Sequence, residues 1–321
     1  MPFQPDRRDL MKLLGVGGVV FASSLAGATD RKRRKSDRDD DDFFFLQLSD
    51  THLGYSGPSD PQADVPLPAV IRAINAAAAK PDFLVFTGDL THMTDDEKLR
   101  RQRMSQFTDI VSRVEVPTRR FLPGEHDAAK DRGRAFQEAF GPTHQVFDHK
   151  GVHFIALDNA SDPAGAVGGA QLDWLAADLK AQPRDARIVV FAHRPLFDLY
   201  PQWEWATQDG GKVVDLLLGH RHVTVFYGHI HQEHHHQTEH IAHHAARSLV
   251  FALPAPGSVP KKVPLPWNPA APFAGLGYRR AALAGERVTL AELPVPANDN
   301  GNARASDRPA GSPPAGAPGS W

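Results

Sequence analysis

The sequence contains no cysteine and has almost no excess of one charge. Without cysteine there is no disulfide, thiolate metal ligand or cysteine nucleophile, so any bound metal must use nitrogen and oxygen ligands. Lys and Arg number 36 against 38 Asp and Glu, a balance that gives no electrostatic argument for nucleic acid as a partner. A basic run, Arg31–Lys35, is followed at once by the largely acidic run Asp37–Asp42. We therefore expect no nucleic-acid partner, and a small-molecule substrate fits better.

The apolar run near the N-terminus, Leu13–Ala26, is shorter than the roughly 17 to 25 residues that span a bilayer. It follows the pair Arg7-Arg8 and ends in Ala26-Gly27-Ala28. This arrangement resembles a bacterial twin-arginine export signal with an A-x-A cleavage site. The resemblance implies that the twin-arginine export machinery is a partner and that the mature protein is periplasmic or secreted. We expect no stable membrane insertion, and a permanent anchor is the alternative.

Composition divides the chain of 321 residues into four segments. Residues 1–28 are expected to be the signal peptide, and residues 29–42 a charged, disordered linker. The folded domain is expected at 43–294, because 41% of the residues are hydrophobic and can build a sizeable core. The segment 295–321 is rich in Pro, Gly and Ala and is expected to be a disordered tail.

Within the folded segment, short apolar runs alternate with segments of helical periodicity, which predicts a layered α/β architecture. Helices are expected at 67–79, 95–114, 132–140, 171–179 and 213–218. Strands are expected at 43–48, 82–86, 118–122, 146–148, 152–157, 187–192, 223–227, 249–253, 278–283 and 287–293.

Clusters of Asp and His follow five of these predicted strands directly. Loops at strand ends converge in α/β folds, so the clusters are expected to meet in one site. Any one of them alone is weak evidence, since an Asp after a strand is more often a helix cap. The five clusters, in chain order, are Ser49-Asp50-Thr51-His52, Gly88-Asp89, Gly124-Glu125-His126-Asp127, His193-Arg194 and Gly228-His229-Ile230-His231.

In this order the clusters resemble the calcineurin-like metallophosphoesterase family, whose pattern runs D-x-H, G-D, G-N-H-[DE], H and G-H-x-H. The short connections favour the cyclic-nucleotide-phosphodiesterase branch of the family. The resemblance implies a four-layer α/β/β/α sandwich of two mixed β-sheets flanked by helices. It also implies an exported enzyme that hydrolyses phosphodiester or phosphomonoester bonds, the diester being favoured.

Carried over onto these motifs, the resemblance implies two transition-metal ions, divalent or trivalent, with Mn, Fe and Zn as candidates. It assigns Asp50, His52 and His231 to one metal, His193 and His229 to the other, and Asp89 as a bridge. The attacking group would be a metal-bridging hydroxide. The remaining implied roles belong to His126 as general acid, to Asp127 as an orienting residue, and to Arg194 and His92 as substrate-binding residues. For Arg194, an ordinary surface position is the alternative.

Two positions depart from the family pattern. Glu125 stands where the family has an asparagine ligand, and we expect it to bind the second metal, with a side chain that points away as the alternative. The added carboxylate predicts tighter metal binding and a less electrophilic site. His92 stands where the related purple acid phosphatases have a tyrosine ligand to iron, so we expect no tyrosinate colour and a His92 that lies beside the metals or faces substrate.

Histidine is abundant, at 17 residues, with a dense tract from His234 to His244. The tract is either an auxiliary zinc or nickel site or a polar loop or strand edge with solvated side chains. Trp203 and Trp205 either line the substrate entrance or pack in the core. A different function, a non-catalytic metal-binding or storage protein, also fits the histidine content, although a store needs no general acid at His126.

Overall fold

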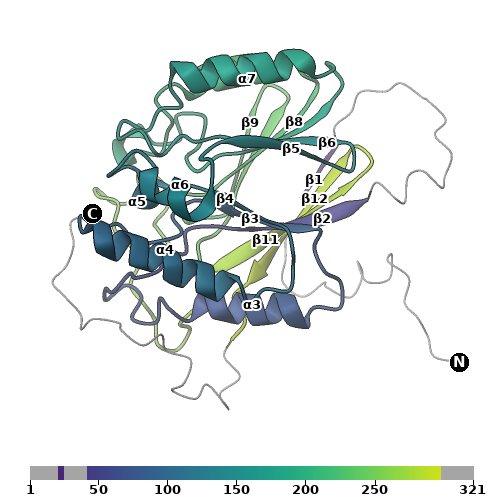
Figure 1. Cartoon of the computed structure of the whole chain (residues 1–321). Helices are drawn as coiled ribbons and strands as arrows, with labels where there is room; N and C mark the ends of the chain where they lie inside the picture. Colours follow the sequence, from purple (N-terminus) through teal and green to yellow (C-terminus); the bar gives the residue numbers. More distant parts are fainter. Residues whose placement is uncertain (1–20, 25–41, 298–321) are drawn as a thin grey trace, which may run out of the picture.

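Two six-stranded β-sheets pack face to face, and helices cover their outer sides (Figure 1). The computed structural model describes residues 21–24 and 42–297. The predicted tail beyond residue 297, the linker up to residue 41 and the Arg7-Arg8 pair lie outside the described residues. Of the predicted signal peptide, only Phe21–Ser24 is described, as strand β1. Among the described residues, no helix is both long and apolar enough to cross a bilayer.

The first sheet has the strand order β1-β12-β11-β2-β3-β4. Its parallel part consists of β2 (Phe43–Leu48), β3 (Phe83–Thr87) and β4 (Arg119–Leu122). The hairpin of β11 (Gly277–Ala284) and β12 (Arg287–Pro294) pairs antiparallel with β2, and β1 (Phe21–Ser24) pairs antiparallel with β12. The sheet is therefore mixed, with its parallel strands all ending at one edge.

The second sheet has the strand order β5-β6-β7-β8-β10-β9. A parallel centre of β6 (Val152–Ala156), β7 (Arg187–Phe191), β8 (His222–Tyr227) and β10 (Ile241–Ala245) is flanked by two antiparallel edge strands. These edge strands are β5 (Gln145–His149) and β9 (His234–Thr238).

The helices form the two outer layers. On the first sheet lie α3 (Pro66–Ala76) and α4 (Glu97–Val111), and on the second lies α7 (Gly169–Ala181) (Figure 1). Helix α8 (Gly210–Leu217) packs on the second sheet beside α7. Helix α4 begins after Asp96, whose carboxylate accepts hydrogen bonds from the backbone N–H groups of Lys98 and Leu99. Two shorter helices, α5 (Glu125–Ala128) and α6 (Arg134–Phe140), follow β4, and a 3₁₀ turn spans Pro201–Trp203.

Aromatic side chains hold the two sheets together. Phe45 is fully buried between them and makes edge-to-face contacts with Phe191 and Phe226 of the second sheet, at ring-centroid distances of 5.4 and 5.3 Å. Separate apolar clusters fill the space between each sheet and its own helices. The expected four-layer sandwich of two mixed sheets is therefore confirmed.

One predicted strand is wrong. Leu249–Leu253 is largely buried but belongs to neither sheet, with a bend at Leu249 and Val250, and the strands of this region are β9 and β10, which run through the histidine tract. The backbone of this run is satisfied by loops and not by a neighbouring strand. The N–H of Leu249 donates to the carbonyls of Ser49 and Asp50, and the carbonyl of Phe251 accepts a bond from the imidazole of His231.

Candidate metal centre

The loops after β2, β3, β4, β7 and β8 converge at one edge of the sandwich. Each of these strands ends two or three residues before a predicted ligand, so the parallel ladders bring the side chains together. The predicted ligands that converge are Asp50, His52, Asp89, Glu125, His193, His229 and His231, and they form two compact groups that share this edge.

The first group joins Asp50, His52 and His231, all of them buried. The Nε2 atoms of His52 and His231 lie 3.2 Å apart, and Nε2 of His231 lies 3.4 Å from Oδ1 of Asp50. Two imidazoles and a carboxylate with ligand atoms this close match the first metal site that the sequence predicts.

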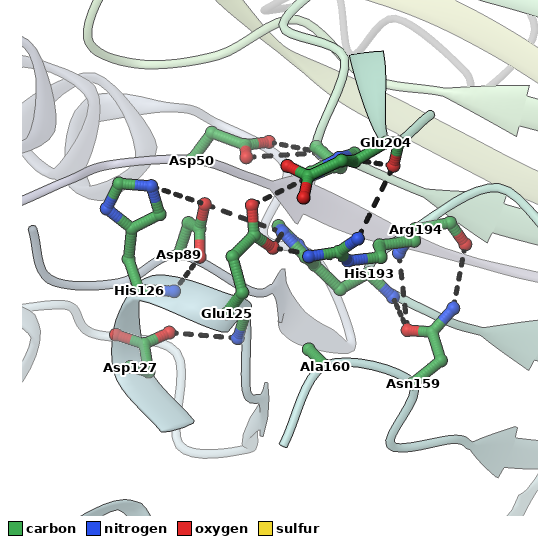
Figure 2. Close-up of polar contacts among 12 residues, drawn as sticks. Asp50, Asp89, Glu125, His126, Asp127, Asn159, Ala160, His193, Arg194 and Glu204 are labelled. Carbon is green, nitrogen blue, oxygen red and sulfur yellow. Dashed lines mark hydrogen bonds and ion pairs between the residues drawn. The ribbon is translucent and has the colours of Figure 1, made fainter. Parts of the chain in front are cut away.

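The second group joins Asp89, Glu125, His193 and His229; Figure 2 shows Asp89 and His193 close to the carboxylate of Glu125. Glu125 lies at its centre, with Oε2 2.9 Å from Nε2 of His193 and Oε1 3.0 Å from Nδ1 of His229. Asp89 lies between the groups, since its Oδ2 is 3.4 Å from Nε2 of His52 and 3.5 Å from Nε2 of His193. The side chain of Glu125 therefore points into the second group, and Asp89 lies where a ligand shared by the two groups would lie.

Hydrogen bonds to backbone carbonyls determine which ring nitrogen of three histidines carries the lone pair. His193 and His231 each donate from Nδ1, to the carbonyls of Thr87 at 2.7 Å and of Phe251 at 2.8 Å, and His229 donates from Nε2 to the carbonyl of Glu204 at 3.1 Å. In the neutral imidazole the other nitrogen then carries a lone pair, and it faces the carboxylates.

Lone pairs that face carboxylate oxygens repel unless a proton or a metal cation lies between them. Nε2 of His193 and Oε2 of Glu125 are both buried and have no hydrogen-bond partner among the described residues. Nitrogen and carboxylate donors of this kind suit Mn, Fe or Zn. The residues present therefore fit the two-metal centre that the sequence predicts.

The backbone is strained where the ligands sit. Asp50, His52, Asp89, His229 and His231 all have positive φ, between 40° and 66°, a region that non-glycine residues seldom adopt. Each such residue costs about 1–3 kcal/mol, and strain of this type is commonly found at functional sites. The rest of the sandwich thus holds the ligand loops in conformations that they would not adopt alone.

Two motif glycines are required by close approach. A Cβ at Gly228 would lie 1.9 Å from Oγ of Ser49 and 2.7 Å from Oδ2 of Asp50, and a Cβ at Gly88 would lie 2.2 Å from Nδ1 of His193. The glycines that precede Asp89 and His229 therefore allow the backbone to pass directly behind other ligands.

Electrostatics within the centre are governed by burial and by the opposed charges of carboxylates and imidazoles. Burial lowers the pKa of His193, but Asp89 and Glu125 outweigh it and hold this pKa well above its ordinary value. Burial and Glu125 raise the pKa of Asp89, but the neighbouring histidines prevail and lower it. Burial dominates at His52, whose pKa lies well below its ordinary value. Asp89 is thus held in its ionised form, the form that binds a cation.

His126 lies at the side of the pocket, with its side chain 21% exposed. Its Nδ1 accepts a hydrogen bond from the N–H of Met93 at 3.1 Å, so a neutral His126 carries its proton on Nε2, which lies 4.0 Å from Oδ2 of Asp89. Asp127 is buried, and its carboxylate accepts bonds from the N–H groups of Gly124, Leu90 and Thr91. Asp127 thus orients the backbone that carries Asp89 and Glu125.

The two predicted substrate-binding residues lie on opposite sides of the centre. Arg194 is 7% exposed, so it is not a surface residue, and its Nε lies 3.6 Å from Oε2 of Glu125. His92 is half-buried, with its Nδ1 3.4 Å from Nδ1 of His52 and its ring centroid 5.0 Å from that of His126. The structure thus places His92 beside the first group and Arg194 against a predicted ligand.

Sequence reasoning missed several residues of the site. Phe251, Leu253, Lys262 and Pro264 line the pocket together with the histidines; the first two belong to the apolar run Leu249–Leu253, and the last two to the proline-rich stretch that follows it. Asn159 fixes the His193 loop by accepting from the N–H groups of His193 and Arg194. Asn159 also follows a strand closely, which is the signal that could have identified it, whereas nothing in the sequence marks Lys262.

The histidine tract lies on the hairpin of β9 and β10. Among the residues described there, no three side chains come close enough to form a metal-binding group, which favours the strand-edge interpretation. The expectation of solvated side chains is wrong for His243 and His244, which are buried in the more central strand. Trp203 and Trp205 are also buried and pack with Tyr227 and Phe251, in agreement with the core alternative.

Comparison with known sequences gives a consistent result. The family model described as calcineurin-like phosphoesterase matches residues 45–233. The chain is 28% identical over 199 residues to a protein of Rhodococcus erythropolis named probable cyclic nucleotide phosphodiesterase, covering 58% of this chain and 64% of that protein. It is 29% identical over 160 residues to a protein of Arcobacter nitrofigilis named probable glycerophosphodiester phosphodiesterase, covering 47% and 56%. The chain thus spans less than two thirds of the length of these curated relatives.

A solved structure gives a similar comparison for the fold. The crystal structure of a dimetal phosphatase from Danio rerio superposes with a TM-score of 0.56 at 12% sequence identity, covering 78% of this chain and 96% of that one. The family match spans more than half of the chain and includes all five motifs, from Asp50 to His231. This chain therefore belongs to the calcineurin-like phosphoesterase family.

Proposed function

We propose that this protein is a metal-dependent phosphodiesterase with a dinuclear centre. The observation that supports this most directly is the pair of adjacent ligand groups, with Asp89 between them and a histidine on the pocket wall whose Nε2 faces the centre. A storage protein would have no use for such a histidine. When bound, the metals would lower the pKa of water and neutralise phosphate oxygens.

The protein's own residues supply the proton and the geometry. As general acid His126 would act in its imidazolium form, passing the proton on Nε2 to the leaving oxygen and returning to the neutral imidazole, whose Nδ1 then accepts the bond from the N–H of Met93 seen in the structure. Asp127 would keep His126 in place indirectly, because it bonds the backbone of Gly124 at the start of the same short helix. The Nε2–H of His126 thus points from the wall into the site without any rearrangement of the strands.

The pocket favours a small diester. Its lining includes the apolar side chains of Phe251, Leu253 and Pro264 and the side chain of Lys262, whose ammonium donates to the carbonyl of Trp203 at 3.2 Å and lies 4.0 Å from Oε2 of Glu204. Lys262 would attract an anionic phosphate, and the apolar wall would contact the second ester group. The names of the two relatives, which refer to cyclic nucleotides and glycerophosphodiesters, support a diester substrate over a monoester.

Export through the twin-arginine pathway is part of the same proposal, and it is supported by the sequence of residues 1–28. Cell fractionation of the full chain and of an Arg7→Lys/Arg8→Lys variant tests it. The proposal requires the wild type in the periplasm or medium and the variant retained in the cytoplasm. Equal distribution of the two proteins would refute export by this route.

The activity is tested by hydrolysis of an aryl phosphodiester and of the matching monoester, with the metal-free full chain reloaded separately with Mn, Fe, Zn or Ni. We expect faster hydrolysis of the diester and loss of activity in Asp89→Ala. If two ions bind and neither ester is hydrolysed, the storage alternative replaces the proposal.

A further inference from the structure

Glu125 and Arg194 form an ion pair at the edge of the second ligand group (Figure 2). We propose that Arg194 is a positioning residue that offsets the charge of Glu125, so that the pair replaces a neutral ligand in the second metal site. The inference rests on the proposed two-metal function. It assigns Arg194 to metal binding, whereas the sequence suggested contact with substrate.

The guanidinium of Arg194 is enclosed and not free to reach substrate. Its Nη1 donates to the carbonyl of Glu204 at 3.4 Å, and its side chain is 9% exposed. A Cβ at Gly165 would lie 2.9 Å from Nη1, so a glycine with φ of 69° allows the chain to cover the guanidinium closely. Arg194 is therefore held against Glu125, and its side chain does not line the pocket.

The main chain of Arg194 is fixed as firmly as its side chain. The side chain of Asn159 accepts from the N–H of Arg194 at 3.2 Å and donates to its carbonyl at 2.9 Å. This places the guanidinium and the imidazole of His193, the preceding residue, in a set relation to each other. Oε2 of Glu125 contacts both side chains, so the carboxylate lies between the imidazole of His193 and the guanidinium of Arg194.

Charge explains why such a pair is needed. Asp89 and Glu125 both belong to the second group, and two carboxylates in one buried site repel each other. An asparagine at position 125 would add no charge, whereas a glutamate adds one that Arg194 cancels. The distance of 3.6 Å is that of an ion pair and not of a hydrogen bond, so Oε1 and Oε2 remain available to a cation.

Because Glu125 and Arg194 form an ion pair, the effect of a substitution at one position on metal affinity should depend strongly on the residue at the other. In Glu125→Asn, the guanidinium of Arg194 stays buried beside the second metal without its carboxylate partner. We therefore expect the affinity of the second site for its metal to fall roughly tenfold or more. In the double variant Glu125→Asn/Arg194→Gln the uncompensated cation is gone. We expect the second site to bind its metal within about threefold of the wild-type affinity, because a neutral ligand replaces a carboxylate whose charge was already offset. Arg103→Gln is the matched control, since Arg103 lies near the site but bonds the backbone of His92 and Gly54.

The experiment is titration of the metal-free full-length proteins with Mn²⁺ and Zn²⁺ by calorimetry, with urea unfolding of each variant to confirm that it folds. We expect that adding Arg194→Gln to the Glu125→Asn variant restores the metal affinity of the second site. Adding Arg103→Gln to the same variant should not restore it. If the double variant binds no better than Glu125→Asn while the wild type binds two ions, the inference is overturned and the two-metal function stands. If the wild type itself fails to bind two ions, the proposed function fails. KM for the aryl diester is measured as well. If Arg194→Gln raises this KM by the same factor whether position 125 is Glu or Asn, and metal affinity does not change, then Arg194 binds substrate and the inference is again overturned.

Discussion

Nε2 of His52 and Nε2 of His231 lie 3.2 Å apart, and His231 is held there by the bond from its Nδ1 to the carbonyl of Phe251. Because Nε2 of His231 carries a lone pair in this arrangement, a cation between the two rings should stabilise the fold. We expect Mn²⁺ or Zn²⁺ at a hundredfold excess over its Kd to raise the free energy of unfolding by about 2.7 kcal/mol for each site. Urea unfolding of the metal-free and reloaded protein measures this. A His231→Ala variant should lose the gain of the first site, to which His231 belongs, and an equal gain in the variant would contradict the assignment.

Replacement of His126 with Gln should slow hydrolysis in a way that depends on the leaving group. A proton donor matters most when the leaving oxygen is basic, so we expect a loss of roughly 10²- to 10⁴-fold for an alkyl diester and a much smaller loss for a nitrophenyl diester. Steady-state rates on the two substrates measure the difference. A uniform loss on both esters would indicate damage to the metal centre instead, which metal analysis of the variant would detect.

Replacement of Gly228 with Ala should disrupt the first ligand group. The added methyl would lie 1.9 Å from Oγ of Ser49, so the loop must shift and Asp50 and His229 must move with it. We expect loss of one bound metal and destabilisation of about 2 kcal/mol or more, typical of a clash in a packed interior. Gly211 in α8 is the matched control, because nothing lies within 4 Å of its Cβ position and alanine there should stabilise by about 0.5–1 kcal/mol. Metal content and urea unfolding of both variants test this prediction, and full metal content in Gly228→Ala would contradict it.

His243 should make the protein sensitive to mild acid. Burial, with a smaller contribution from the charge of His236, lowers the pKa of His243 to about 3 from the ordinary 6.5. Below pH 6.5 the unfolded chain takes up a proton that the folded protein excludes. The stability contributed by the neutral imidazole is therefore complete above pH 6.5 and is lost as the pH falls from 6.5 towards 3.

At pH 5 this loss is about 2 kcal/mol. The variant His243→Leu removes the titrating group, so we expect the difference in unfolding free energy between pH 8 and pH 5 to shrink by about that amount. Urea titrations at the two pH values measure it. His240→Gln, at the exposed turn between β9 and β10, is the control and should behave as the wild type does. An unchanged pH dependence in His243→Leu would refute the prediction.

Much of the site could be predicted because its residues follow strands. Asp50, Asp89 and His229 are close to one another in space since parallel strands end at a common edge, and apolar runs such as Phe43–Leu48 and Arg187–Phe191 mark those strands clearly. The order of the motifs then predicted the family and the sandwich. The side chains of both predicted metal groups meet in the structure as the resemblance implied.

Other features depend on tertiary context that periodicity does not record. The buried run Leu249–Leu253 has the composition of a strand, yet its backbone bonds the ligand loops, while the polar histidine tract forms the strands. Arg194 and Glu125 are distant in the sequence, and their pairing appears only when α5 and the loop after β7 are folded against each other. Lys262 reaches the pocket from a loop with no regular pattern, so no sequence signal marks it.

The two ligand groups have one further consequence. In each group some ligands follow strands of the first sheet and others follow strands of the second: Asp50 and His52 face His231, and Asp89 and Glu125 face His193 and His229. An ion bound in either group therefore ties the two halves of the sandwich together at one edge. In a chain without cysteine, the ions would act as cross-links between the sheets that form with metal loading and open with chelation.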